Sequence, residues 1–186
     1  MFESFLILLF LITSCAVISK NEVLQINQRL ETYELDVPIS KLVMIIPKDG
    51  FVQKDNRQGR GTDNPRYFYF VNERQKIIIS GWFEPEQKYS GIETILENDM
   101  KASAAANLPL PKNVSFITVS NWDAVIFDQP YDGFTIAHLR AHWLQAGTWI
   151  DIHISQKSNS SNSEARSRLI EILKAIQVRE KNSVKS

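Results

Sequence analysis

AHLRAHWLQAGTWIDIHIS, residues 137–155, reads as two alternating strands joined by a short turn, and it sets the pattern for the rest of this 186-residue chain. If the chain turns through Ala146 and Gly147, His142 lies opposite Asp151. This register gathers six apolar side chains on one face, namely Leu139, Ala141, Trp143, Ile150, Ile152 and Ile154. A shift of one residue would set histidines against isoleucines, so the pattern predicts this register and one buried face.

The other face of this hairpin carries all three histidines of the chain, His138, His142 and His153, together with Arg140 and Asp151. Three interpretations remain open: a solvated polar face, a pocket for a ligand or partner, and a metal or catalytic site. In the last of these, His142, Asp151 and His153 would bind a zinc-like ion. Arg140 argues against a metal because its fixed positive charge would lie beside the cation. We therefore expect a polar sheet face, without a metal.

We expect three of the four tryptophans in the core and one at the surface. Trp82, Trp122 and Trp143 fall within predicted strands and are expected in the core. Trp149 instead falls on the polar face of the 137–155 hairpin, next to the turn. We expect Trp149 to be the tryptophan that contacts a partner at the surface.

The rest of the sequence predicts further strands and two helices. Strands are predicted over residues 33–37, 41–47, 66–71 and 76–83, and a further hairpin over 113–129, turning near Ser120 and Asn121. The strands at 66–71 and 76–83 do not alternate cleanly, so both of their faces are expected to be covered.

Apolar stripes predict helices in the segments 90–111 and 161–178. Ser90 with Glu93, and Ser161 with Glu164, have the spacing of a capping box. The order of strands, helix, four strands and helix predicts a single α+β domain over residues 32–186, built around a mostly antiparallel sheet.

The order of five stretches along the chain resembles that of the PsbP/DcrB-like exported bacterial proteins. These stretches are LVMIIPKDGF, IIISGWF, NWDAVIFD, TWIDIHIS and LIEILKAIQV. They cover most of residues 42–178. The resemblance implies a sheet of hairpins packed by two main helices in an α/β/α sandwich. It also implies an exported accessory domain, and it contributes no catalytic residues.

The N-terminal segment predicts export and a lipid anchor. Its apolar run, Phe5–Ile12, is shorter than the roughly 20 residues of a membrane span and fits a signal peptide over residues 1–14. The residues ITSC resemble a bacterial lipobox, which would make Cys15, the only cysteine, the lipid attachment site and 15–31 a tether. Because Ala16 follows Cys15 in place of an aspartate, the resemblance implies an outer-membrane lipoprotein on the periplasmic side. An ordinary signal peptide is the alternative, since Glu3 replaces the usual base.

A long segment at 47–66 is the second candidate contact surface. It carries Lys54, Arg57 and Arg60 and has a local excess of positive charge. Two interpretations remain open: a solvated loop, and a docking loop for a partner or an acidic ligand. Its GRG sequence lacks the glycine spacing and the Lys-Ser/Thr of a phosphate-binding loop, so no nucleotide site is predicted.

Composition limits the remaining function classes. Lys plus Arg and Asp plus Glu both number 21, so no global charge favours nucleic acid. The chain contains no G-x-S-x-G or H-E-x-x-H motif, and no cofactor is expected. The sequence predicts a lipid-anchored envelope protein that binds a ligand or an envelope protein without catalysis. The alternative is a metal-dependent or histidine-using hydrolase with its site on the 138–153 hairpin.

Overall fold

The computed structural model describes residues 31–38, 40–54, 66–158 and 162–181. Cys15, Arg57 and Arg60 lie outside the described residues, as do the predicted signal peptide and most of the tether. Within the described ranges, no helix has both the length and the apolar character that a membrane crossing requires.

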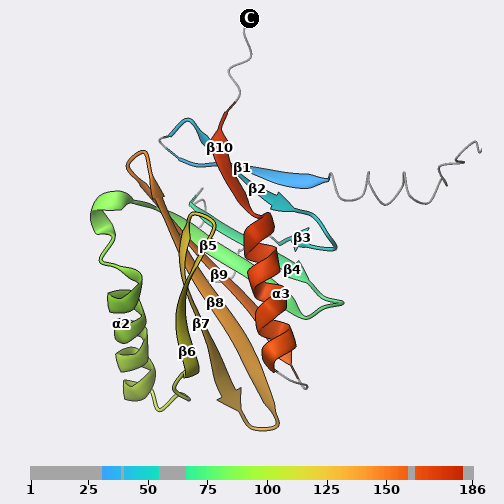
Figure 1. Ribbon diagram of the computed structural model, residues 1–186, viewed down its shortest axis with the longest axis vertical. Coiled ribbons are helices and arrows are strands. Elements are labelled where there is room, and N and C mark those ends of the chain that lie inside the picture. Colours follow the sequence, from blue (N-terminus) through green and yellow to red (C-terminus); the bar gives the residue numbers. More distant parts are fainter. Residues whose placement is uncertain (1–30, 39, 55–65, 159–161, 182–186) are drawn as a thin grey trace, which may run out of the picture.

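Two antiparallel sheets form the framework (Figure 1). The larger sheet has the order β3 (Val52–Gln53), β4 (Tyr67–Asn72), β5 (Ile77–Pro85), β9 (Thr148–Ser158), β8 (Phe134–Gln145), β7 (Trp122–Tyr131) and β6 (Lys112–Val119). The smaller sheet has the order β1 (Thr32–Asp36), β2 (Leu42–Pro47) and β10 (Gln177–Glu180). The sequence predicts one sheet, and the second is a finding of the structure.

Two main helices cover opposite faces of the larger sheet. Helix α3 (Asn162–Ala175) lies along one face, and helix α2 (Ile92–Ala105) lies on the other side of the sheet, after a short 3₁₀ turn, η1 (Glu86–Lys88) (Figure 1). The predicted fold class is therefore confirmed: one α+β domain in which two helices pack on a large antiparallel sheet.

The main hydrophobic core lies between α3 and the larger sheet. Leu169 and Leu173, one turn apart on α3, are both fully buried, as the predicted stripe requires. The sheet contributes alternate residues from its central strands, including Phe68, Phe70, Ile77, Ile79, Leu139, Ala141, Ile150, Ile152 and Ile154. Residues of the smaller sheet, such as Met44 and Ile46, extend the same core.

One glycine allows the central strands to pack closely. A Cβ atom on Gly81 of β5 would lie 2.2 Å from the backbone oxygen of Asp151 and 2.3 Å from the ring of Phe68. No side chain fits in this space, so a glycine is needed where β5 pairs with β9 and packs against Phe68.

Several local predictions are wrong. Helix α2 begins after Gly91, which has a φ of 93° and no side-chain cap, so Ser90 does not form the expected capping box. Helix α3 ends at Ala175, because the following residues leave the helix and pair with β2 as strand β10. Ser161 of the second predicted cap lies outside the described residues.

The strands β4 and β5 alternate between buried and half-buried residues, so only one of their faces is fully covered. Phe68 and Phe70 face the core, whereas Tyr67 and Tyr69 are half-buried. The expectation that both faces are covered is therefore only partly met. The segment 47–66 is also not all loop, because β3 lies within it and pairs with β4.

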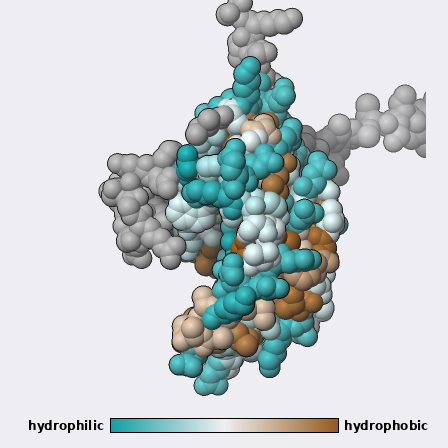
Figure 2. Space-filling view, turned by 90° about the vertical axis from the view of Figure 1, so that its left-hand side faces the viewer, coloured by the Kyte–Doolittle hydropathy of each residue, from teal (hydrophilic) through white to brown (hydrophobic). Residues whose placement is uncertain are grey.

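Apolar side chains remain exposed around the edge strand β6. Leu108 and Leu110 precede this strand, and Val114 and Phe116 lie on it, with 37 to 53% of each residue exposed. Figure 2, seen from the α2 side, shows apolar surface gathered in the lower half of the molecule. Substitutions at these exposed positions are expected to change stability little.

Candidate functional site

The β8–β9 hairpin has the predicted register. His142 pairs with Asp151, Arg140 with His153, and His138 with Ser155. Ala146 and Gly147 both have positive φ values, as a tight two-residue turn requires. The six predicted apolar residues of this hairpin are all buried in the core, so the apolar pattern located both faces correctly.

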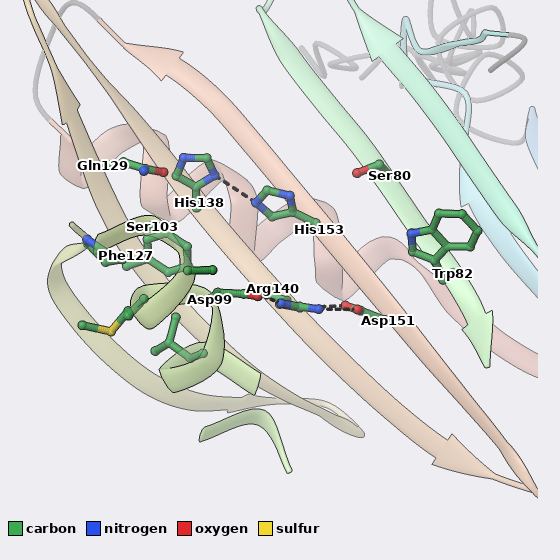
Figure 3. A pocket seen from close by; sticks show the side chains of 15 residues that line it. Ser80, Trp82, Asp99, Ser103, Phe127, Gln129, His138, Arg140, Asp151 and His153 are labelled. Carbon is green, nitrogen blue, oxygen red and sulfur yellow. Dashed lines mark hydrogen bonds and ion pairs between the residues drawn. The ribbon is translucent and has the colours of Figure 1, made fainter. Parts of the chain in front are cut away.

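The histidine face is covered, and the expectation of an open polar face is wrong. Helix α2 lies over this face and leaves a pocket of about 490 Å³ between helix and sheet (Figure 3). The pocket is lined by four residues predicted from the sequence (His138, Arg140, Asp151 and His153) and by further residues, among them Ser80, Asp99, Phe127 and Gln129. Its size lies within the usual range for small-molecule sites, about 300 to 1,000 Å³.

Arg140 is the charged centre of the pocket. Its Nε and one terminal nitrogen bind the two carboxylate oxygens of Asp151 at 3.0 and 2.6 Å, and its other terminal nitrogen pairs with Asp99 of α2. Burial would lower the pKa of Arg140, but the two carboxylates raise it above its ordinary value. Burial would likewise raise the pKa of Asp151, but the nearby imidazole of His142 and the two hydrogen bonds from Arg140 lower it to about 2. Both groups are therefore ionised and paired at neutral pH.

His138 and His153 form a hydrogen-bonded imidazole pair. Nδ1 of His138 lies 2.9 Å from Nε2 of His153, whereas the ring centroids lie 5.0 Å apart, and the ring planes differ by 13°. The rings therefore meet edge to edge, in the geometry of a hydrogen bond. Burial, with the neighbouring imidazole, lowers the pKa of His138 to about 3. Burial, with the charge of Arg140, lowers the pKa of His153 to about 4. Both rings are uncharged at neutral pH.

His142 and Trp149 belong to a buried aromatic cluster beside the pocket. His142 is fully buried, and its ring packs edge-on against Trp149 and Tyr89 at centroid distances of 5.3 and 5.4 Å. Trp149 is only 9% exposed, because Tyr89, between η1 and α2, packs on it. The expectation that Trp149 presents an open surface is therefore wrong.

The residues considered for a metal do not form a ligand set. Nε2 of His142 lies 3.3 Å from Asp151, but both oxygens of that carboxylate bind Arg140, and His153 pairs with His138. Among the described residues, no group of three or more His, Cys, Asp or Glu side chains is arranged to hold a metal ion. The proposed set of His142, Asp151 and His153 therefore lacks the free carboxylate that it requires.

The basic segment contributes one described residue of the three predicted. Nζ of Lys54 lies 3.2 Å from Oε1 of Glu73 in an exposed ion pair. Such a pair contributes little to stability and leaves the lysine accessible. Arg57 and Arg60 lie outside the described residues.

Asp99 is the pocket residue that the sequence could have indicated. It lies three residues after Leu96, so it falls on the same helical stripe that faces the sheet. A carboxylate within an apolar stripe indicates a charged partner below the helix, and that partner is Arg140. Phe127 and Ser80 lacked any such signal, because their place in the pocket depends on strand pairing.

Sequence comparisons identify no relatives: no known family matches the chain, and no curated protein matches it. Solved structures do resemble it. The Ran-binding protein Mog1p of Saccharomyces cerevisiae superposes with a TM-score of 0.53 at 10% identity, covering 81% of this chain and 95% of Mog1p. A protein from Bacteroides thetaiotaomicron gives a TM-score of 0.41 at 12% identity, covering 76% of this chain and 46% of that protein. At such identities the likeness to Mog1p extends to the fold alone, a large β-sheet packed by helices.

Proposed function

We propose that this chain is an exported, lipid-anchored envelope protein, and that its domain is a non-catalytic binding module of the PsbP/DcrB-like kind. The pocket beneath α2 is its ligand site. The leader motif around Cys15 supports the anchor, and the basic segment with Lys54, Arg57 and Arg60 is the proposed contact for an envelope protein partner.

The observation that supports binding over catalysis is that the reactive side chains of the pocket are already paired with one another. Arg140 and Asp151 neutralise each other, and His138 and His153 bind each other. Ser80 lies opposite His153 in the strand register, but among the described residues no hydrogen bond joins the two. A base with a pKa near 4 that does not contact a nucleophile is poorly suited to hydrolysis at neutral pH. The hydrolase alternative therefore has less support than binding.

Anchoring is tested by expressing the full chain with its own leader and comparing it with Cys15→Ser. The wild-type chain is expected in the membrane fraction with the mass of a lipid-modified product, and Cys15→Ser is expected to lose both properties. Ser14→Ala, which keeps a small residue before the cysteine, is the matched control and is expected to behave as wild type. An unchanged mass and membrane fraction for Cys15→Ser contradicts the anchor.

The binding role is tested separately, by adding mixtures of small polar compounds to the processed chain and recording backbone amide spectra. Saturable shifts centred on α2, β8 and β9 are expected. Shifts confined to other parts of the described chain contradict the assignment of the pocket as the ligand site.

A further inference from the structure

We infer that the pocket beneath α2 takes an uncharged, hydroxyl-rich ligand of the sugar or polyol class. This inference rests on the proposed function, because it requires the pocket to be a binding site. It adds the chemical class of the ligand.

The charges of the pocket disfavour tight binding of an ion. Asp99, Arg140 and Asp151 are the acidic and basic side chains among the described residues that line it. Arg140 already binds both carboxylates, so an anion would have to displace one of them from the guanidinium. Asp151 is engaged through both oxygens, which leaves an incoming cation only the carboxylate of Asp99, whose side chain is 61% exposed. Exposed ion pairs contribute little, so a neutral ligand fits this lining best.

The imidazole pair offers hydrogen bonds without charge. The contact between Nδ1 of His138 and Nε2 of His153 needs a proton on one of the two nitrogens. If His138 donates, Nδ1 of His153 carries a proton and is a donor. If His153 donates, its Nδ1 is a bare acceptor. Among the described residues, no partner satisfies this nitrogen.

His138 has a matching unsatisfied atom. It is 92% buried, since 8% of its surface is exposed, and its Nε2 has no hydrogen-bond partner among the described residues. This nitrogen is itself closed to solvent, so a ligand reaches it only if the side chains around it shift. A hydroxyl group both donates and accepts, so it can satisfy either arrangement of protons in the pair. A carboxylate can only accept and an ammonium group can only donate, so neither has this adaptability.

The remaining walls combine aromatic surface with small polar groups. Phe127 packs against His138 with ring centroids 5.0 Å apart and near-parallel planes, and Trp82 lies at the β5 side of the pocket (Figure 3). Aromatic rings provide flat apolar surface for the C–H faces of a sugar. Ser80, Ser103 and Gln129 add neutral polar side chains around these rings.

The test is a titration of the processed chain, kept in a detergent without a sugar headgroup, with glucose, N-acetylglucosamine, glycerol, acetate and methylammonium. Imidazole signals and the Trp82 indole signal report the binding. Saturable shifts with at least one of the hydroxyl compounds are expected, with a Kd on the order of 1 mM for so small a ligand. Acetate and methylammonium are expected to give no saturable shift at the same concentrations.

Variants localise the effect. His153→Phe keeps a planar ring but removes both nitrogens, and it is expected to weaken binding by about tenfold or more. Lys157→Gln, an exposed substitution on the same strand and outside the pocket, is the control and is expected to bind as wild type. Both variants are checked for unchanged thermal unfolding.

Each other outcome has a definite meaning. If acetate or methylammonium binds at these signals and the hydroxyl compounds do not, the inferred ligand class is wrong while the binding pocket stands. If none of the five probes binds at about 50 mM, some fifty times the expected Kd, the inferred class is again wrong. The separate screen with compound mixtures then decides whether the pocket is a ligand site at all. If His153→Phe binds the hydroxyl compounds as tightly as wild type does, the imidazole pair does not hydrogen-bond the ligand.

Discussion

Arg140 and Asp151 form a two-point ion pair across the β8–β9 hairpin, with nitrogen to oxygen distances of 3.0 and 2.6 Å. The two residues are diagonal neighbours in the register, because Arg140 lies opposite His153 and Asp151 lies opposite His142. This pair fixes both charges of the hairpin beneath α2. His138 and His153 beside it remain uncharged, and they offer hydrogen bonds in place of charge.

Removing Arg140 is expected to destabilise the protein strongly. Arg140→Met leaves Asp151, whose side chain is 11% exposed, as a buried charge without its main partner, which costs about 3 to 5 kcal/mol of the free energy of unfolding. The double variant Arg140→Met/Asp151→Leu is expected to recover much of this loss, because no charge stays buried. Urea unfolding at neutral pH measures both. If Arg140→Met alone is as stable as wild type, the ion pair with Arg140 does not stabilise the buried charge of Asp151.

Stability is expected to fall in mild acid. The pKa values of His138 and His153 are lowered to about 3 and 4 in the folded chain, below the value near 6.5 of an unfolded histidine. The unfolded state therefore binds protons first, and the free energy of unfolding decreases as the pH falls from about 6.5 toward 4. The expected loss is a few kcal/mol for the pair.

Urea unfolding at pH 7.0, 5.5 and 4.5 checks this slope, and the double variant His138→Phe/His153→Phe is expected to flatten it. Asp151 does not contribute in this range. Its pKa is lowered to about 2, so its stabilisation is lost only below about pH 4. A wild-type slope as flat as that of the double variant would contradict the burial of uncharged imidazoles.

Gly81→Ala is expected to be among the most damaging small substitutions in the domain. The new Cβ would lie 2.2 Å from the backbone oxygen of Asp151, which cannot move without shifting β9. We expect a loss of about 3 kcal/mol or more, or failure to fold. The control is Gly133→Asn, where nothing lies within 4 Å and asparagine tolerates the positive φ of 77°. Thermal unfolding compares the two, and equal stability would show that β5 and β9 are not so closely packed.

Two leucines test the position of the core. Leu169→Ala on α3 removes a fully buried side chain and is expected to cost about 2 to 5 kcal/mol. Leu108→Ala makes the same chemical change at a residue that is 53% exposed and is expected to change stability by about 0.5 kcal/mol or less. Urea unfolding measures both, and similar losses for the two would contradict the packing of α3.

The features of the fold that depend on local pattern can be predicted from the sequence. The β8–β9 register followed from apolar alternation, because a one-residue shift would bury histidines against the core. The apolar stripe of α3 was also correct. Both features are set by residues close in the chain.

The errors concern contacts between distant elements. The polar residues of β8 and β9 predict an open histidine face, but α2 covers it through Asp99 and Leu96. The sequence predicts Trp149 at the surface, but Tyr89, 60 positions earlier in the chain, buries it. The sequence pattern predicts helix at β10, but this segment pairs with β2, which lies more than 130 residues away. Tertiary packing, and not local propensity, decides these features.

The most direct test of the account is the protonation state of the imidazole pair, read from long-range ¹H–¹⁵N correlations of the histidine side chains at pH 6. We expect His138 and His153 to be both neutral, each with one protonated and one bare ring nitrogen, since their pKa values lie near 3 and 4. Imidazolium signals that titrate near the ordinary pKa of about 6.5 would contradict it, because the pocket would then carry positive charge and its ligand would be an anion.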